Sequence, residues 1–305
     1  MSIFLKFIMV NVIVFAQQVD ELEKKIQSTD PGIRRQAIVE MSQTRNPKYL
    51  DYIERYVDDE AKIVKLAAIE GVGLYRSTRT VEKILNILSK TTDNDIKNSC
   101  LIALSYIPSI ENRGVIKNLA LKDKDENIRA QAIRLLGNLN DNSIEDEMLK
   151  LAEDDKQVSF LRASAIDYLS KIKSKKAEKI ILKLLKSEDK QIRVQAIRAC
   201  GDMQIKESQE ILRIISGEND PDVQLESSFS LAKLGDKFPL KYLYKYLDDK
   251  NVVYKNMALN IIGIIGDNDS VKILDEKIKV EENPNFKSFM EFTRERIKGR
   301  IKNQK

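Results

Sequence analysis

Few residue groupings in this sequence are suited to catalysis. Two pairs of neighbouring carboxylates, Asp154–Asp155 and Asp248–Asp249, could act as general acid and base. Both pairs stand in polar turns between predicted helices, where aspartate more often ends or caps a helix. Gly71 and Gly73 could begin a phosphate-binding loop, but they lie inside a predicted helix, where a small residue serves packing. We therefore expect no catalytic residues and a protein that is not an enzyme.

Histidine and tryptophan are both absent from the 305 residues. A chain without histidine has no histidine-based catalytic triad, none of the common zinc and haem ligand sets, and no histidine pH switch. We expect no metal site and no cofactor. The two cysteines, Cys100 and Cys200, fall on the core faces of predicted helices that lie three repeats apart. We expect them to be buried free thiols and not a disulfide.

The charge of the chain is concentrated at its C-terminus. The formal net charge is +5, and residues 287–305 hold seven basic and two acidic residues, so the rest of the chain is neutral. A nucleic-acid-binding protein usually has a basic face along the fold, so we expect no nucleic acid partner. Two interpretations of the basic end stay open: a solvated terminal helix, or a weak electrostatic contact with a membrane surface or another polyanion.

The first residues resemble a secretory signal peptide. Lys6 precedes an apolar run that ends at Phe15, and Val14 and Ala16 are small residues at the positions required before a cleavage site. The sequence predicts a signal peptide at residues 1–16 and export, in a bacterium, to the periplasm or cell envelope. An uncleaved anchor and an internal start at Met9 are the alternatives.

The rest of the chain is an internal repeat. Nine apolar anchor residues follow one another at intervals of 31 to 33 residues. In the first eight repeats a small residue comes four positions after the anchor, an apolar residue eight after it, and Ser, Gly or Ala nine after it. The anchor and the positions four and eight after it lie on one face of an α-helix. This helix is here called the B helix. The anchors are Ile33, Val64, Ile96, Ile128, Leu161, Ile192, Val223, Tyr254 and Phe286.

Most B helices have a predicted start. A second amphipathic segment, the A helix, precedes each B helix. Asp or Asn stands three residues before the anchor in seven of the nine repeats, at the position of an N-cap. Nine A–B hairpins fit between Val19 and Ile301. Because a two-helix repeat cannot bury its apolar face alone, we expect one continuous stack.

The consensus of these repeats, best matched at Asp125–Gly137 and Asp189–Gly201, resembles the HEAT-repeat superfamily. It is closest to the short bacterial HEAT-like repeats of the phycobilin-lyase type. The resemblance implies an all-α fold: a right-handed α-solenoid of about nine helical hairpins, as a single domain over 17–305. Residues 269–305 would be a degenerate basic cap. It also implies that the basic residue after each anchor, such as Arg34, pairs with an Asp30-type acid, the N-cap residue, in or near the next repeat.

The same resemblance implies a scaffold that binds a protein or peptide on its concave row of B helices. Positions two, six and ten after each anchor point away from the predicted core. Apolar residues there would form a contact surface, with polar residues between them for specificity. The candidate partner-binding residues are Leu66, Leu74, Ile102, Tyr106, Arg134, Arg198, Leu225, Phe229 and Ile264.

The sequence thus predicts a non-catalytic, exported HEAT-repeat scaffold that binds a protein or peptide partner in the cell envelope. The alternative is a cytoplasmic HEAT-like protein associated with nucleic acid or with a modifying enzyme of the lyase or glycosylase kind. Iron-binding HEAT hydroxylases use histidine and HEAT-like DNA glycosylases use tryptophan, and this chain has neither residue.

Overall fold

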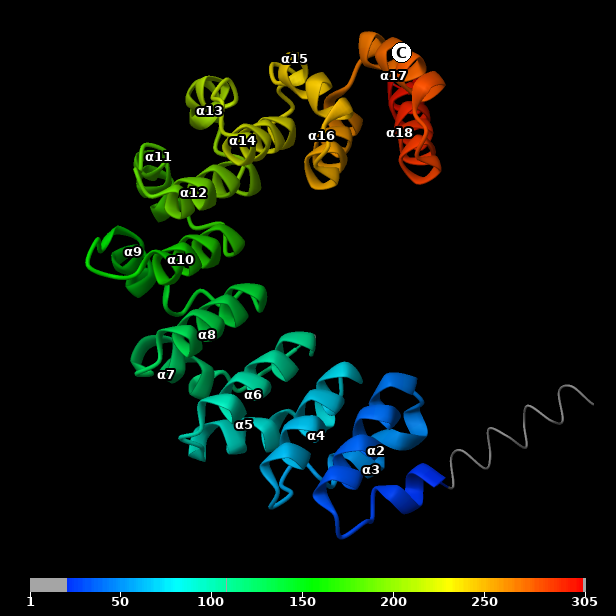
Figure 1. Cartoon of the computed structure of the whole chain (residues 1–305). Helices are drawn as coiled ribbons and strands as arrows, with labels where there is room; N and C mark the ends of the chain where they lie inside the picture. Colours follow the sequence, from blue (N-terminus) through cyan, green and yellow to red (C-terminus); the bar gives the residue numbers. More distant parts are fainter. Residues whose placement is uncertain (1–20, 108, 304–305) are drawn as a thin grey trace, which may run out of the picture. The chain divides into compact units, whose positions relative to one another are not determined.

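A computed structural model describes residues 21–107 and 109–303, and these residues form helices and no strand (Figure 1). The α-helices are α2 (Pro31–Thr44), α3 (Leu50–Glu54), α4 (Lys62–Leu74), α5 (Val81–Lys90), α6 (Asn94–Tyr106), α7 (Gly114–Lys122), α8 (Glu126–Asn138), α9 (Glu145–Glu153), α10 (Ser159–Lys171), α11 (Glu178–Leu184), α12 (Lys190–Asp202), α13 (Gln209–Ile215), α14 (Pro221–Lys233), α15 (Leu240–Leu243), α16 (Val252–Ile265), α17 (Asn268–Val280) and α18 (Pro284–Lys302). Short 3₁₀ turns are η1 (Pro47–Tyr49), η2 (Thr78–Thr80), η3 (Lys175–Ala177), η4 (Lys206–Ser208) and η5 (Tyr244–Asp248).

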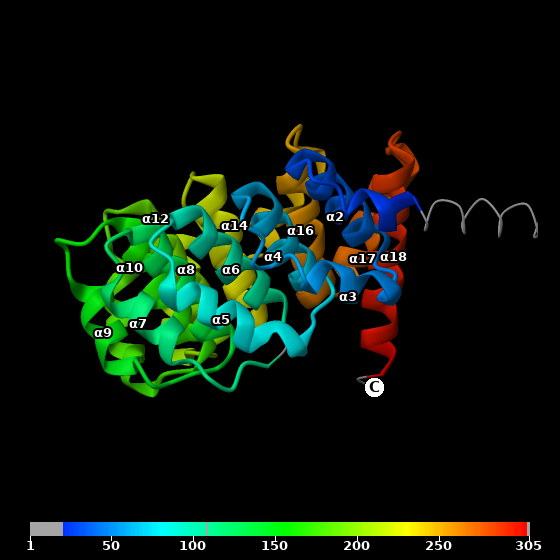
Figure 2. The ribbon, with the colours of Figure 1, turned by 90° about the horizontal axis from the view of Figure 1, so that it is seen from below.

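The helices pack in consecutive pairs, which confirms the α-solenoid. Each even-numbered helix is a predicted B helix, and from α4 on each packs against the A helix before it. Within the described residues B helices also pack on their neighbours, α2 on α4 and α12 on α14 among them. Helix α18 lies beside α17 in both ribbon views (Figures 1 and 2).

The chain divides into two compact units, Met1–Asn142 and Ser143–Lys305. The first, the N-terminal unit, contains repeats one to four, and the second, the C-terminal unit, contains repeats five to nine. The single domain over 17–305 therefore stays a prediction. The predicted signal peptide at residues 1–16 lies outside the described residues, and among those described no helix is long and apolar enough to cross a membrane.

All seven predicted N-caps are confirmed. In each, the side chain accepts a hydrogen bond from a backbone N–H of the first helical turn, a group that has no partner inside the helix. Helices α4 and α10 have Ala61 and Val158 at the N-cap position, and neither residue offers a side-chain hydrogen bond. The capping residues are Asp30, Asp93, Asp125, Asp189, Asp220, Asn251 and Asn283.

The predicted small column allows close helix contacts. A Cβ built on Gly73 of α4 would lie 2.6 Å from the Cα of Ala103 in α6, and one on Gly201 of α12 would lie 2.8 Å from the Cα of Ser230 in α14. The residue nine after one anchor thus meets the residue seven after the next. Cys100 and Cys200 are buried free thiols, as expected, and burial raises the pKa of each to about 12.

A ladder of ion pairs is present, but the expected partner is wrong: the acid is not the cap residue and stands two residues before the next cap position, because the cap carboxylates already accept backbone hydrogen bonds. Arg34 pairs with Asp59 at 2.9 Å, and Lys97 pairs with Asp123 at 2.6 Å. Arg193 with Glu218 and Lys255 with Glu281 repeat the arrangement in the C-terminal unit. These cations link successive repeats.

Several basic residues of the last helix, Arg294 and Arg300 among them, have partners within the protein. Arg294 pairs with Asp275 at 2.8 Å, and Arg300 donates to the carbonyl oxygens of Gly263, at 2.8 Å, Ile264 and Gly266. These carbonyls lie at the C-terminus of α16, where a cation offsets the negative end of the helix dipole. Burial lowers the pKa of Arg300. These contacts favour a structural role for the basic end of the chain.

Candidate functional site

The C-terminal unit has a groove across successive B helices, here called the α12–α16 groove, with a volume of about 640 Å³. Each of these helices starts at a fixed N-cap, so the same positions of α12, α14 and α16 face the groove. It is lined by Ala163, Lys190, Gln191, Val194, Gln195, Arg198, Asp222, Leu225, Glu226, Val253, Tyr254 and Met257.

The groove has apolar walls that differ in exposure. Leu225 and Ala163 are buried, Val194 and Met257 are half-buried, and Val253 at the start of α16 is 68% exposed. An apolar side chain bound here would leave water for contact with these residues, and such burial is favourable.

Every charged residue that lines the groove is paired. Arg198 pairs with Glu226, and Lys190 pairs with Asp222 and with Asp220, each at 2.8 Å. The hydroxyl of Tyr254 donates to Asp222 at 3.0 Å. The hydrogen bonds from Lys190 and Tyr254 lower the pKa of Asp222, so this carboxylate stays ionised at neutral pH.

A smaller hollow of about 230 Å³ lies between α6 and α8 of the N-terminal unit. It brings together two predicted residues, Ile102, which is 37% exposed, and Arg134, whose Nε donates to the carbonyl of Ala130. Tyr106 is 45% exposed and does not line the hollow. Leu101, Ser105, Gln131, Leu135 and Asn138 complete the lining.

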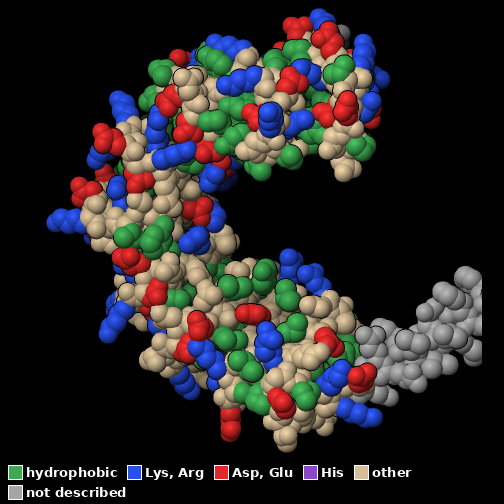
Figure 3. Space-filling view, in the orientation of Figure 1, with side chains coloured by type: hydrophobic (Ala, Val, Ile, Leu, Met, Phe, Trp, Pro, Cys, Tyr) green, Lys and Arg blue, Asp and Glu red, His purple; other side chains and the backbone are tan. Residues whose placement is uncertain are grey.

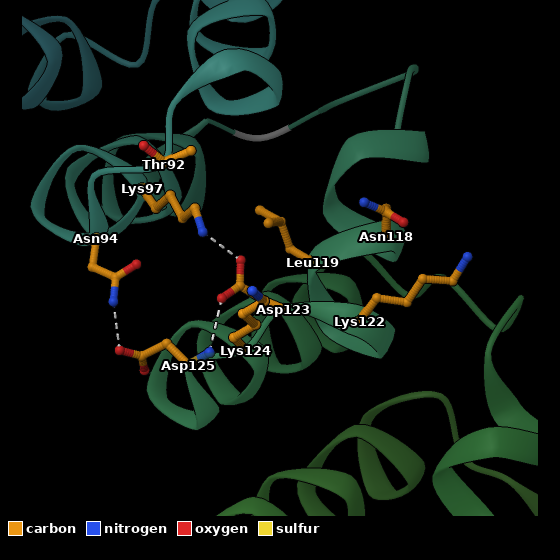
Figure 4. Close-up of a pocket in the computed structure, with 9 residues that line it drawn as sticks. All are labelled: Thr92, Asn94, Lys97, Asn118, Leu119, Lys122, Asp123, Lys124 and Asp125. Atoms are coloured by element: carbon orange, nitrogen blue, oxygen red, sulfur yellow. Dashed lines mark hydrogen bonds and ion pairs between the residues drawn. The ribbon is translucent and has the colours of Figure 1, made fainter.

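A third pocket, of about 610 Å³, lies where α6, α7 and α8 meet (Figure 4). Lys97 reaches Asp123 at 2.6 Å, and Asn94 donates to Asp125 at 2.7 Å. These side chains belong to the ladder and to a helix cap. The pocket contains no residue predicted to bind a partner, and its polar contacts hold repeats three and four together.

The sequence pattern described as HEAT repeats matches residues 16–109 and 115–199, more than half of the chain. The chain belongs to the HEAT-repeat family. No curated protein shows significant sequence similarity to it.

Several solved structures resemble this chain at low sequence identity. YibA from Escherichia coli is 16% identical, with 85% of this chain and 95% of that chain covered and a TM-score of 0.50. An engineered protein is 18% identical, with 95% and 90% covered and a TM-score of 0.49. The complex of CpcE and CpcF of phycocyanin lyase from Nostoc sp. is 16% identical, with 89% and 93% covered and a TM-score of 0.39. At 16% identity the likeness to YibA shows the fold alone.

The expectation that every candidate contact residue points away from the core is wrong for one residue, Leu225. Leu225 is fully buried, so a partner could touch it only at the floor of the groove. The repeat pattern predicts a core face formed by the anchor and the positions four and eight after it, which leaves position two outside. Helix α14 instead packs against α12 and α16 as well as α13, and this widens its buried side to include the position two after the anchor.

The remaining predicted residues of the HEAT repeats are spread over several places. Leu66 and Leu74 lie half-buried on α4, next to α6. Phe229 and Ile264 are half-buried against the apolar cluster of the last repeats, and the ammonium of Lys233 lies 4.4 Å from the Phe229 ring. The structure thus joins Ile102 to Arg134, and Arg198 to Leu225, in two separate depressions.

Of the twelve residues that line the groove, the sequence predicted only Arg198 and Leu225. Among the ten that it did not predict are Val194, Val253, Tyr254 and Met257. Tyr254 gave a signal, since it is the one anchor residue that carries a hydroxyl group. Val194 lies two residues after its anchor, a position expected to face away from the core. It was not predicted as a contact residue because the other outward positions of its repeat are polar.

The HEAT repeats also place the possible catalytic groups at structural positions. Asp154 accepts a hydrogen bond from the backbone of Lys156, Asp249 accepts one from Asn251, and Asp248 pairs with Lys277. Residues 21–107 and 109–303 contain no group of three Cys, Asp or Glu side chains able to hold a metal ion. On the face shown in Figure 3, basic and acidic side chains are interspersed in both units.

Proposed function

We propose that this HEAT-repeat protein is a non-catalytic scaffold that binds a protein or peptide partner in the cell envelope through its B helices. The observation that carries the proposal is the α12–α16 groove, which combines an apolar interior with a rim of fixed ion pairs. Protein contact surfaces combine an apolar centre and a polar edge in the same way.

Exposed apolar side chains on the B helices of the N-terminal unit support the same function. Ile102 and Tyr106 lie one turn apart on α6, with 37% and 45% of their surfaces exposed. Neighbouring α4 adds Leu66 and Leu74, both half-buried. Tyrosine is enriched among the residues that dominate binding energy, so Tyr106 is the strongest single contact candidate.

The non-catalytic assignment and the location rest on the sequence. Catalysis needs a group held ready to transfer a proton or attack a substrate, and the carboxylates of the groove are committed to Arg198, Lys190 and Tyr254. Export follows from the signal-like residues 1–16.

The double substitution Ile102→Ser and Tyr106→Asn tests the proposed contact surface. Both side chains are exposed, so we expect the fold to persist, while capture of the partner from envelope extract falls about 10- to 100-fold. The measurement is quantitative mass spectrometry after cross-linked pull-down on immobilised protein.

A matched control is the double substitution Ile214→Ser and Val280→Asn, which changes two apolar residues of A helices that are each 74% exposed. Capture should be unchanged for this variant. Equal losses in both variants, or none in the first, would place the binding surface elsewhere.

A further inference from the structure

The chemistry of the α12–α16 groove defines the class of segment that it can take. Two cations and two carboxylates line it, and each is satisfied within the protein: Arg198 by Glu226, and Lys190 by Asp222. A charged ligand group would have to displace one member of a formed pair, and the like-charged member would repel it. The pairs are partly open to solvent, so each contributes little, but the groove offers a charged group no unpaired partner in exchange.

The uncharged residues of the groove can replace the contacts with water that an uncharged ligand loses on binding. Val194 of α12 and Val253 and Met257 of α16 offer apolar contact. The buried Leu225 of α14 forms the floor between them. The side-chain amide of Gln191, which is exposed at the groove, can donate to and accept from a peptide backbone.

The dimensions suit an extended chain. Packed helices stand about 8–10 Å apart, so the two steps from α12 to α16 span about 16–20 Å. An extended peptide advances about 3.3 Å per residue, and about six residues would cross the groove.

We propose that the α12–α16 groove binds an uncharged, apolar peptide segment of about six residues in extended conformation, and that it discriminates against acidic and basic segments. This inference rests on the proposed function, because it specifies the partner of that same site. Charge complementarity is its basis: the groove holds no net charge and no unpaired charged side chain among its lining residues.

The test uses dye-labelled octapeptides that are acetylated and amidated, with alternating Ser and Leu. Three counterparts carry Ser, Glu or Lys in place of Leu. Fluorescence anisotropy with the full chain should give the order Leu, then Ser, with the Glu and Lys peptides weakest and at least about tenfold below the Leu peptide. Equal or tighter binding of the Glu or Lys peptide would overturn the inference.

A matched pair of variants places the binding site. Val253→Asp puts a carboxylate at the rim of the groove, whereas Val280→Asp puts one at a valine of α17 that is equally open to solvent, 74% against 68% exposed. The first should weaken the Leu peptide about tenfold or more and the second should leave it unchanged. Loss in both variants, or in neither, would contradict the assignment to the groove.

The outcomes separate this inference from the proposed function. If a charged peptide binds and Val253→Asp abolishes that binding, the groove is a partner site and only the ligand class is wrong. If no peptide binds, the inference fails, and capture by the Ile102 and Tyr106 variant still decides whether the B helices bind a partner.

Discussion

Replacing Gly201 with alanine is expected to destabilise the protein by about 1–3 kcal/mol. The added Cβ would lie 2.8 Å from the Cα and 2.9 Å from the Oγ of Ser230. Ser230 cannot simply turn away, since its hydroxyl donates to the carbonyl of Ile197 at 2.7 Å. Helices α12 and α14 must therefore move apart. The measurement is urea unfolding followed by circular dichroism.

The control is Gly299→Ala in α18, where an added Cβ meets nothing within 4 Å. Alanine favours the helix over glycine by about 0.5–1 kcal/mol, so this variant should be slightly more stable than the wild type. A stabilised Gly201→Ala protein would mean that the two helices do not approach as closely as described.

Deleting Pro284–Lys305 is expected to have the larger effect of the two. The deletion removes the buried side chains of Phe286, Met290 and Ile297 and uncovers Ile262 and Ile265 of α16. Each buried side chain of this size contributes about 1.5–3 kcal/mol. We expect a lower melting temperature and poor solubility, because a terminal repeat must cover the last apolar face of the stack.

Two single substitutions distinguish a structural cap from a detached charged tail. Arg300→Gln should cost about 1–3 kcal/mol, since it removes the donor to the last carbonyls of α16. Lys302→Gln removes the same charge from an exposed position and should be nearly neutral. An unchanged melting curve for the truncated protein would instead favour a tail that contacts membrane or polyanion.

Much of the fold follows from local chemistry in the sequence. The caps were predictable because Asp30 and its equivalents each stand three residues before an apolar anchor, a spacing that has one strong meaning. The C-terminal ends of the helices could not be predicted in the same way. The described residues twelve after an anchor include Arg45, Arg76, Lys173 and Gln204, which adopt positive φ although their types do not favour it. Only Gly235 and Asn140 among these positive-φ residues are of a type that favours that conformation.

The site was less predictable, because it depends on how repeats stack. Ile102 and Tyr106 were placed correctly as exposed, since one turn of α6 decides their direction. Leu225 was not, because its burial comes from two neighbouring helices far away in sequence. The pairing of Arg198 with Glu226 likewise joins residues of different repeats, and no periodicity within one repeat reveals it.

One measurement tests most directly whether the B helices bind a partner in the cell envelope: photo-cross-linking in intact cells with p-benzoylphenylalanine at position 106. Tyr106 is aromatic and 45% exposed, so the substitution should be tolerated. The matched site is Phe238, an aromatic residue 36% exposed just before the A helix α15. The account predicts a specific adduct with an envelope protein from position 106 and none from position 238. Adducts only from position 238, or adducts with cytoplasmic proteins or nucleic acid, would contradict it.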